Sequence, residues 1–145
     1  MKDDPAILAV PHATPEDIQA ITETCRIYTE GWFTANEEAV RHSLHPELVK
    51  RGIWFYEKRG RHEVGHTLTA EVMVNATKAG GGSNATESEK TFEITVLDVF
   101  RHIANVKVLS YPFMDYLLLA KIDDRWVVAL SLYEVRYGDQ IVLDP

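Results

Sequence analysis

The residue best placed in this sequence for acid–base chemistry is Asp115. It lies in the middle of the apolar run 111–120, which reads Tyr-Pro-Phe-Met-Asp-Tyr-Leu-Leu-Leu-Ala. A carboxyl group enclosed by such neighbours would be removed from water, which suits it to act as a general acid or base. The alternative is a structural role, in which the carboxylate accepts hydrogen bonds where a strand begins. This alternative is favoured, because buried carboxylates also occur in structural networks.

His45 and Tyr28 are candidate partners for Asp115. His45 precedes Pro46, so its backbone is held extended and the direction of its ring is restricted. We consider it as a base oriented by Asp115, and equally as a helix-terminal histidine that bonds the last carbonyls of its own helix. Tyr28 lies on an apolar helix stripe, where its hydroxyl suits donation to a ligand carbonyl. The alternative is a core tyrosine with its hydroxyl at the rim.

Residues 62–66 read His-Glu-Val-Gly-His and match the zinc-protease pattern H-E-x-x-H. That chemistry needs both histidines on one face of a helix, together with a third ligand. Here Lys-Arg-Gly-Arg precedes the motif and Gly65 interrupts it, which favours a hairpin. Side chains four residues apart on a strand are about 13 Å apart. We therefore predict no metal site and no cofactor, and Cys25 is assigned to the core because no base stands beside it.

The composition restricts the classes of partner. The chain has 145 residues, of which 46% are apolar and 26% charged, as in a single globular domain. Its net charge is -7, which disfavours nucleic acids and anionic membranes as partners. With one cysteine it forms no internal disulfide, and its first residues lack an export signal, so we predict a cytoplasmic protein.

Capping signals and periodicity predict three helices. We interpret residues 1–13 as an N-terminal arm. Thr14 suits an N-cap, with Pro15 at the first helical position and Asp17 three residues after the cap. The helix that follows carries one apolar stripe: Ile18, Ile21, Cys25, Tyr28 and Trp32. Asn36 begins a second helix that runs to about residue 44, and Thr69 caps a third helix over residues 70–78.

The remaining segments predict strands. A short hairpin over 53–57 and 62–68 precedes the third helix, and the glycine-rich segment 79–90 is a flexible loop. Four further strands over 92–100, 103–110, 111–122 and 125–137 complete an α+β fold, with the helices packed on a strongly curved antiparallel sheet. A cavity is expected where the first helix crosses the concave face. The expected lining side chains are Tyr28, Trp32, Phe113, Tyr116 and Trp126.

Several short motifs resemble one family when their order is considered. They are Tyr-Thr-Glu-Gly-Trp at 28–32, Leu-His-Pro-Glu-Leu at 44–48 followed by Lys50 and Arg51, Asp-Tyr-Leu-Leu-Leu at 115–119, and Trp126 after an acidic turn. Together they resemble the putative lumazine-binding group of the NTF2-like, or SnoaL-like, superfamily. The resemblance implies a cone-shaped α+β barrel with an internal pocket at its wide end, often dimerising through the outer face of the sheet. It covers the chain from about residue 14 to residue 133.

The resemblance does not select a function, because the superfamily includes isomerases, dehydratases, epoxide hydrolases, polyketide cyclases and non-catalytic modules. Our leading hypothesis is a small-molecule-binding protein with an apolar pocket for a ring-containing ligand. The alternatives are a cofactor-free lyase or isomerase that uses Asp115, His45 and Tyr28, and a metal-dependent hydrolase at His62 and His66. We expect one domain over residues 14–137, followed by a C-terminal tail over residues 138–145. We also expect a homodimer that forms through the outer face of the sheet.

Overall fold

The computed structural model describes residues 13–143, so nearly all of the predicted arm lies outside the described residues. The chain forms three helices and seven strands within this range. The helices are α2 (Pro15–Phe33), α3 (Glu37–Ser43) and α4 (Ala70–Lys78). The strands are β1 (Leu44–Tyr56), β2 (Arg61–Val64), β3 (Glu93–Phe100), β4 (Ile103–Leu109), β5 (Phe113–Ile122), β6 (Arg125–Val135) and β7 (Ile141–Val142).

Each helix begins at the residue that the sequence predicts. The Thr14 hydroxyl accepts from the Asp17 amide at 3.0 Å, the Asn36 side chain accepts from Ala39 at 3.1 Å, and the Thr69 hydroxyl accepts from Val72 at 3.1 Å. Each side chain satisfies one of the amides that have no partner within the first turn of a helix. These three predictions are therefore confirmed.

The sheet has the strand order β2-β1-β6-β5-β4-β3, and β7 pairs with β1. Strands β3 to β6 form the predicted antiparallel meander. Its last hairpin turns at Asp123 and Asp124, which both have positive φ, as a type I′ turn requires. β1, in contrast, runs parallel to β6, so the sheet is mixed and the prediction of a wholly antiparallel sheet is corrected. The chain between β1 and β6 includes a helix and four strands, which is long enough for a parallel return.

β1 begins earlier than predicted, at Leu44 instead of residue 53. It follows α3 directly and contains Pro46. The pairing with β6 shifts register between Leu44 and Val49, so Pro46 lies in an irregular stretch where its missing N–H interrupts no ladder hydrogen bond. The strand therefore tolerates this proline.

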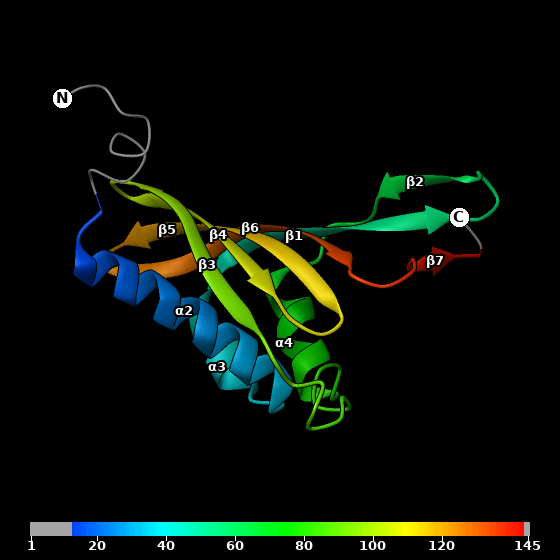
Figure 1. Cartoon of the computed structure of the whole chain (residues 1–145), viewed down its shortest axis with the longest axis horizontal. Helices are drawn as coiled ribbons and strands as arrows, with labels where there is room; N and C mark the ends of the chain where they lie inside the picture. The colour runs from blue at the N-terminus through cyan, green and yellow to red at the C-terminus, as the bar shows by residue number, and fades with distance from the viewer. Residues whose placement is uncertain (1–12, 144–145) are drawn as a thin grey trace.

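All three helices lie against the concave face of the curved sheet, and the β1–β2 hairpin with β7 extends beyond them (Figure 1). The sheet is open, since its edge strands β2 and β3 do not pair with each other. The core between α2 and the sheet is fully buried at Ile21, Val106, Leu117, Leu119 and Val128. None of the helices between residues 13 and 143 combines the length and the apolarity needed to cross a membrane.

Candidate functional site

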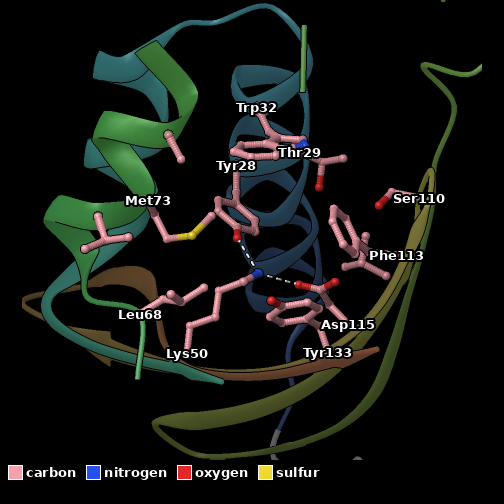
Figure 2. A pocket seen from close by; sticks show the side chains of 13 residues that line it. Tyr28, Thr29, Trp32, Lys50, Leu68, Met73, Ser110, Phe113, Asp115 and Tyr133 are labelled. Carbon is pink, nitrogen blue, oxygen red and sulfur yellow. Dashed lines mark hydrogen bonds and ion pairs between the residues drawn. The ribbon is translucent and has the colours of Figure 1, made fainter. Parts of the chain in front are cut away.

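A cavity of about 220 Å³ lies between α2, α4 and the concave face of the sheet. Its lining comes from the last turns of α2, one face of α4, and strands β1, β4, β5 and β6, with Leu68 and Ser110 from flanking segments. The lining residues are Tyr28, Thr29, Trp32, Lys50, Leu68, Val72, Met73, Ala76, Val108, Ser110, Phe113, Asp115 and Tyr133. Figure 2 shows them around a common space.

The upper wall of the cavity is the indole of Trp32, held in place by the glycine-rich loop. A β-carbon at Gly82 would lie 2.4 Å from Trp32 Cδ1, and one at Gly81 would lie 2.6 Å from Trp32 Cη2. Real β-carbons do not approach so closely, so only glycine lets the loop backbone rest on this ring. The predicted loop over residues 79–90 therefore packs against Trp32 and holds its ring at the cavity wall. Trp32, Phe113, Leu68 and Met73 give the cavity apolar walls.

The floor of the cavity carries a buried polar network centred on Lys50. Its ammonium group donates to the Tyr28 hydroxyl oxygen and to Asp115 Oδ2, each at 2.8 Å (Figure 2). Ser131 Oγ donates to the same carboxylate oxygen at 3.3 Å. The Lys50 and Asp115 side chains are only 8% and 9% exposed, so this ion pair is largely shielded from solvent. Burying such a pair is tolerable only when each charge is paired and hydrogen-bonded.

Gly52 makes room for the aromatic neighbour of this network. Tyr133 on β6 pairs with Gly52 on β1, and a β-carbon at Gly52 would lie 2.3 Å from Tyr133 Cζ. The Tyr133 ring thus lies over the bare backbone of β1 and comes within 4.9 Å of the Lys50 ammonium, measured to the ring centroid. At this distance the ring face attracts the cation.

The pKa values of the two hydrogen-bonded donors are shifted by their surroundings. Burial lowers the pKa of Lys50, but the Asp115 carboxylate and the Tyr28 oxygen raise it by more, so the net pKa lies above the ordinary value. Burial raises the pKa of Tyr28, and Lys50 offsets only part of this effect. At neutral pH the ammonium is therefore charged and the phenol keeps its proton.

The structure brings together four of the residues predicted for the site: Asp115, Tyr28, Trp32 and Phe113. Tyr116 is not among them, because it lies three residues after Phe113 on β5 and so faces the opposite side of the sheet. It is 45% exposed there. Trp126 is also absent from the cavity. It is buried where the start of α2 crosses β6, and its Nε1 donates to Asp17 Oδ1 at 3.1 Å.

His45 does not reach Asp115. It lies at the start of β1 outside the cavity lining, and its Nδ1 accepts a hydrogen bond from the Glu47 amide at 3.0 Å. The protein partners of the Asp115 carboxylate are Lys50 and Ser131 instead. The structure therefore does not assemble the His45–Asp115 pair that the lyase or isomerase alternative requires.

The H-E-x-x-H motif lies in the predicted hairpin, with His62 on β2 and His66 in the segment after it. His62 Nε2 lies 2.8 Å from Asp139 Oδ1, next to β7. Between residues 13 and 143, no three histidine, cysteine or acidic side chains gather as a metal site would need. The geometry that the metal-hydrolase alternative requires is therefore not present in this part of the chain.

Lys50 is the centre of the site but was not among the residues predicted for it. The signal in the sequence is the strand alternation that places Lys50 on the same face as Leu48 and Gly52. In the structure these three residues are buried, and the residues between them are exposed. A lysine on the apolar face of a strand is rarely buried without a partner. It was missed because the predicted strand began only at residue 53, so Lys50 was not assigned to either face.

Comparisons with known proteins agree with this architecture. A family model described as "Putative lumazine-binding" matches residues 16–134. An NTF2-like protein of unknown function from Silicibacter pomeroyi is 16% identical, with a TM-score of 0.68 over 83% of this chain and 97% of that one. A second, from Methylobacillus flagellatus, is 16% identical, with a TM-score of 0.61 over 89% and 99%.

A ketosteroid isomerase-like protein from Erwinia carotovora atroseptica is 14% identical, with a TM-score of 0.59 over 86% of this chain and 100% of that one. Identities this low establish the shared fold alone. Among curated proteins, none matches the sequence.

Proposed function

Because this chain belongs to the putative lumazine-binding family, with an NTF2-like fold, we propose that it binds a small ring-containing molecule in the cavity beneath α2. The observation that carries the proposal is a cavity of about 220 Å³ with apolar walls and a buried Lys50–Asp115 pair at its floor. Ligand sites commonly combine apolar walls with a few polar groups in this way. An apolar cavity of about 150 Å³ holds benzene, so one or two fused rings are the appropriate class of ligand.

The polar groups favour binding over acid–base catalysis. Asp115 and Tyr28 are both bonded to Lys50, and His45 lies outside the cavity. The predicted acid–base reaction needs a second titratable group, oriented by Asp115, to exchange a proton with the bound molecule. Without the second base on which the lyase or isomerase alternative depended, we propose a binding protein.

Blocking the cavity is the test of this proposal. Ala76 on α4 lines the cavity, and Ala76→Phe would place a ring in the space that the ligand needs. Ala79→Phe makes the same change three residues later at an exposed position outside the lining, so it serves as the matched control. Calorimetric titration with a panel of bicyclic aromatic and heteroaromatic compounds should show binding to the wild-type protein and the control variant. At least tenfold weaker binding is expected for Ala76→Phe. Equal affinity for all three proteins would contradict the proposal.

We further propose that a second copy of the chain covers the outer face of the sheet. Five apolar side chains on this face are 41–46% exposed: Val49, Tyr116, Leu118, Leu130 and Leu132. They surround a hollow in which, among residues 13–143, Arg51 is the only charged lining side chain. A contiguous apolar patch with so little charge suits a self-complementary interface, because a twofold axis places the patch on itself without opposing like charges.

Sedimentation velocity tests the dimer. Leu118→Glu places a carboxylate in the hollow, which a twofold interface would bring close to its own copy, so the variant should be a monomer. Ile122→Glu makes a similar change at an exposed position on the same strand outside the hollow and should leave the dimer intact. A monomeric wild-type protein would contradict the proposal.

A further inference from the structure

The carboxylate of Asp115 has one oxygen that the protein does not use. Both of its hydrogen bonds, from Lys50 and from Ser131, go to Oδ2. Among the described residues, the only completely buried side-chain nitrogen or oxygen without a partner is Gln140 Oε1. Asp115 Oδ1 has no hydrogen-bond donor in that part of the chain, so it must touch open space, and Asp115 lines the cavity. This oxygen is a hydrogen-bond acceptor available to a ligand.

Tyr28 presents the complementary group. Its hydroxyl oxygen accepts from Lys50, so its proton remains to be donated, and between residues 13 and 143 no acceptor is bonded to it. Because burial raises the pKa of Tyr28, the hydroxyl is a donor throughout the neutral range. Tyr28 Oη and Asp115 Oδ2 each lie 2.8 Å from Lys50 Nζ, so they are no more than twice that distance, about 5.6 Å, apart. Asp115 Oδ1 belongs to the same carboxylate as Oδ2, so a donor and an acceptor both belong to the Lys50 network on the cavity floor.

The charge of the floor excludes one class of ligand. Lys50 and Asp115 compensate each other within the buried pair. A carboxylate ligand would add a second negative charge beside Asp115 in a space with little water, where like charges repel strongly. A neutral ligand meets no such penalty. The shielding of the pair therefore favours neutral molecules over anions.

We infer that the cavity selects neutral planar rings that carry a cyclic amide, with the carbonyl accepting from Tyr28 and the adjacent N–H donating to Asp115 Oδ1. This inference rests on the proposed binding function and names the chemical class of its ligand. Lys50 acts as a positioning residue, because it holds both recognition groups in place by its two hydrogen bonds. Trp32 and Phe113 provide flat apolar surfaces for the ring.

Two simple bicyclic compounds distinguish recognition of a cyclic amide from nonspecific binding of a ring. 2-Quinolone and coumarin share one bicyclic shape, but 2-quinolone has an N–H where coumarin has a ring oxygen. At Asp115 Oδ1 the N–H gains a hydrogen bond to a charged acceptor, while the ring oxygen faces an unfavourable lone pair. We expect the calorimetric Kd of 2-quinolone to be lower than that of coumarin by about tenfold to a hundredfold. 2-Naphthoate should bind more weakly than either.

Two variants assign the effect to the floor. Tyr28→Phe removes the donor to the carbonyl, which both probes carry, so it should weaken both several-fold and preserve their ratio. Asp115→Asn should remove the preference for 2-quinolone, because its amide oxygen remains with the Lys50 ammonium and an N–H group then faces the ring N–H. Thermal melting of each variant shows whether it folds. The ratio measured in the wild-type protein decides the inference even where a variant does not fold.

The outcomes are distinguishable. A marked preference for 2-quinolone that Asp115→Asn removes supports the inference. Equal affinities for 2-quinolone and coumarin, or tighter binding of 2-naphthoate, would overturn it while leaving the proposed binding function standing. Failure of all three probes, together with the wider panel of bicyclic compounds, would overturn both.

Discussion

Replacing Lys50 by Met tests whether the buried ion pair organises the cavity floor. Met has a similar length but no charge, so Lys50→Met leaves Asp115 buried with only the weak 3.3 Å bond from Ser131. Two unit charges at 2.8 Å attract each other by about 6 kcal/mol at an effective dielectric constant of about 20. Much of this attraction offsets the cost of removing both groups from water. Breaking a buried pair by removing one partner therefore costs about 3–5 kcal/mol, which is the expected loss in the free energy of unfolding.

The double variant Lys50→Met/Asp115→Leu distinguishes the loss of the ion pair from the cost of leaving the Asp115 carboxylate buried without a partner. Without either charge, no desolvated carboxylate remains, and apolar replacements of buried pairs are often neutral or stabilising. We expect the double variant to be more stable than Lys50→Met by at least about 2 kcal/mol. Lys107→Met, at a partly exposed position on β4, is the matched control and should change stability by no more than about 0.5 kcal/mol.

Urea unfolding followed by tryptophan fluorescence measures all four proteins under the same conditions. A loss below about 1 kcal/mol for Lys50→Met would show that Lys50 is not held in a buried pair. A double variant no more stable than Lys50→Met would show that the loss in Lys50→Met does not come from leaving the Asp115 carboxylate without its partner. Either result would refute the account of the cavity floor.

Three further predictions follow from the same structure. The net pKa of Lys50 is raised, so the Lys50–Asp115 pair should stabilise the folded protein from neutral pH to about pH 10 and lose this effect as the pH rises further. The free energy of unfolding of the double variant, measured by urea unfolding, should not show this loss. Gly52→Ala should cost about 1–3 kcal/mol in urea unfolding because its β-carbon would meet the Tyr133 ring, and adding Tyr133→Leu should recover part of that loss. Burial raises the pKa of Cys25 to about 12, and Asp115 adds to the effect. A disulfide reagent should therefore modify Cys25 far more slowly in the folded protein than in the urea-unfolded chain. Equal rates would contradict the buried position of Cys25.

The helices and the meander could be predicted because their signals are local. Thr14, Asn36 and Thr69 each cap a helix through a bond to a residue three positions later, so the determining residues are adjacent in sequence. The two-residue turn at Asp123 and Asp124 fixes the β5–β6 hairpin in the same local way. The parallel pairing of β1 with β6 carries no such signal, because the two strands are far apart in the chain and meet only through the tertiary fold.

The candidate site was predicted in part for the same reason. Asp115 and Phe113 share one face of β5, so the alternation of a strand places both in the cavity. The same alternation excludes Tyr116, whose place in the pocket was predicted from its residue type alone. Lys50 could be assigned to the cavity only once the extent of β1 was known. Trp126 could be excluded from it only once the crossing of α2 over β6 was known. Contacts of this kind depend on how elements pack together.

The most direct test of the central claim is methyl NMR of the protein titrated with 2-quinolone. The chain has three methionines, two of which lie in the described range. Met73 lines the cavity, whereas Met114 is on the face of β5 that carries Tyr116 and the outer hollow. We predict a saturating shift of the Met73 methyl signal, with intermolecular contacts from the ligand ring to that methyl and little change at Met114. Contacts to Met114 without any at Met73 would place the ligand on the outer face and contradict the account.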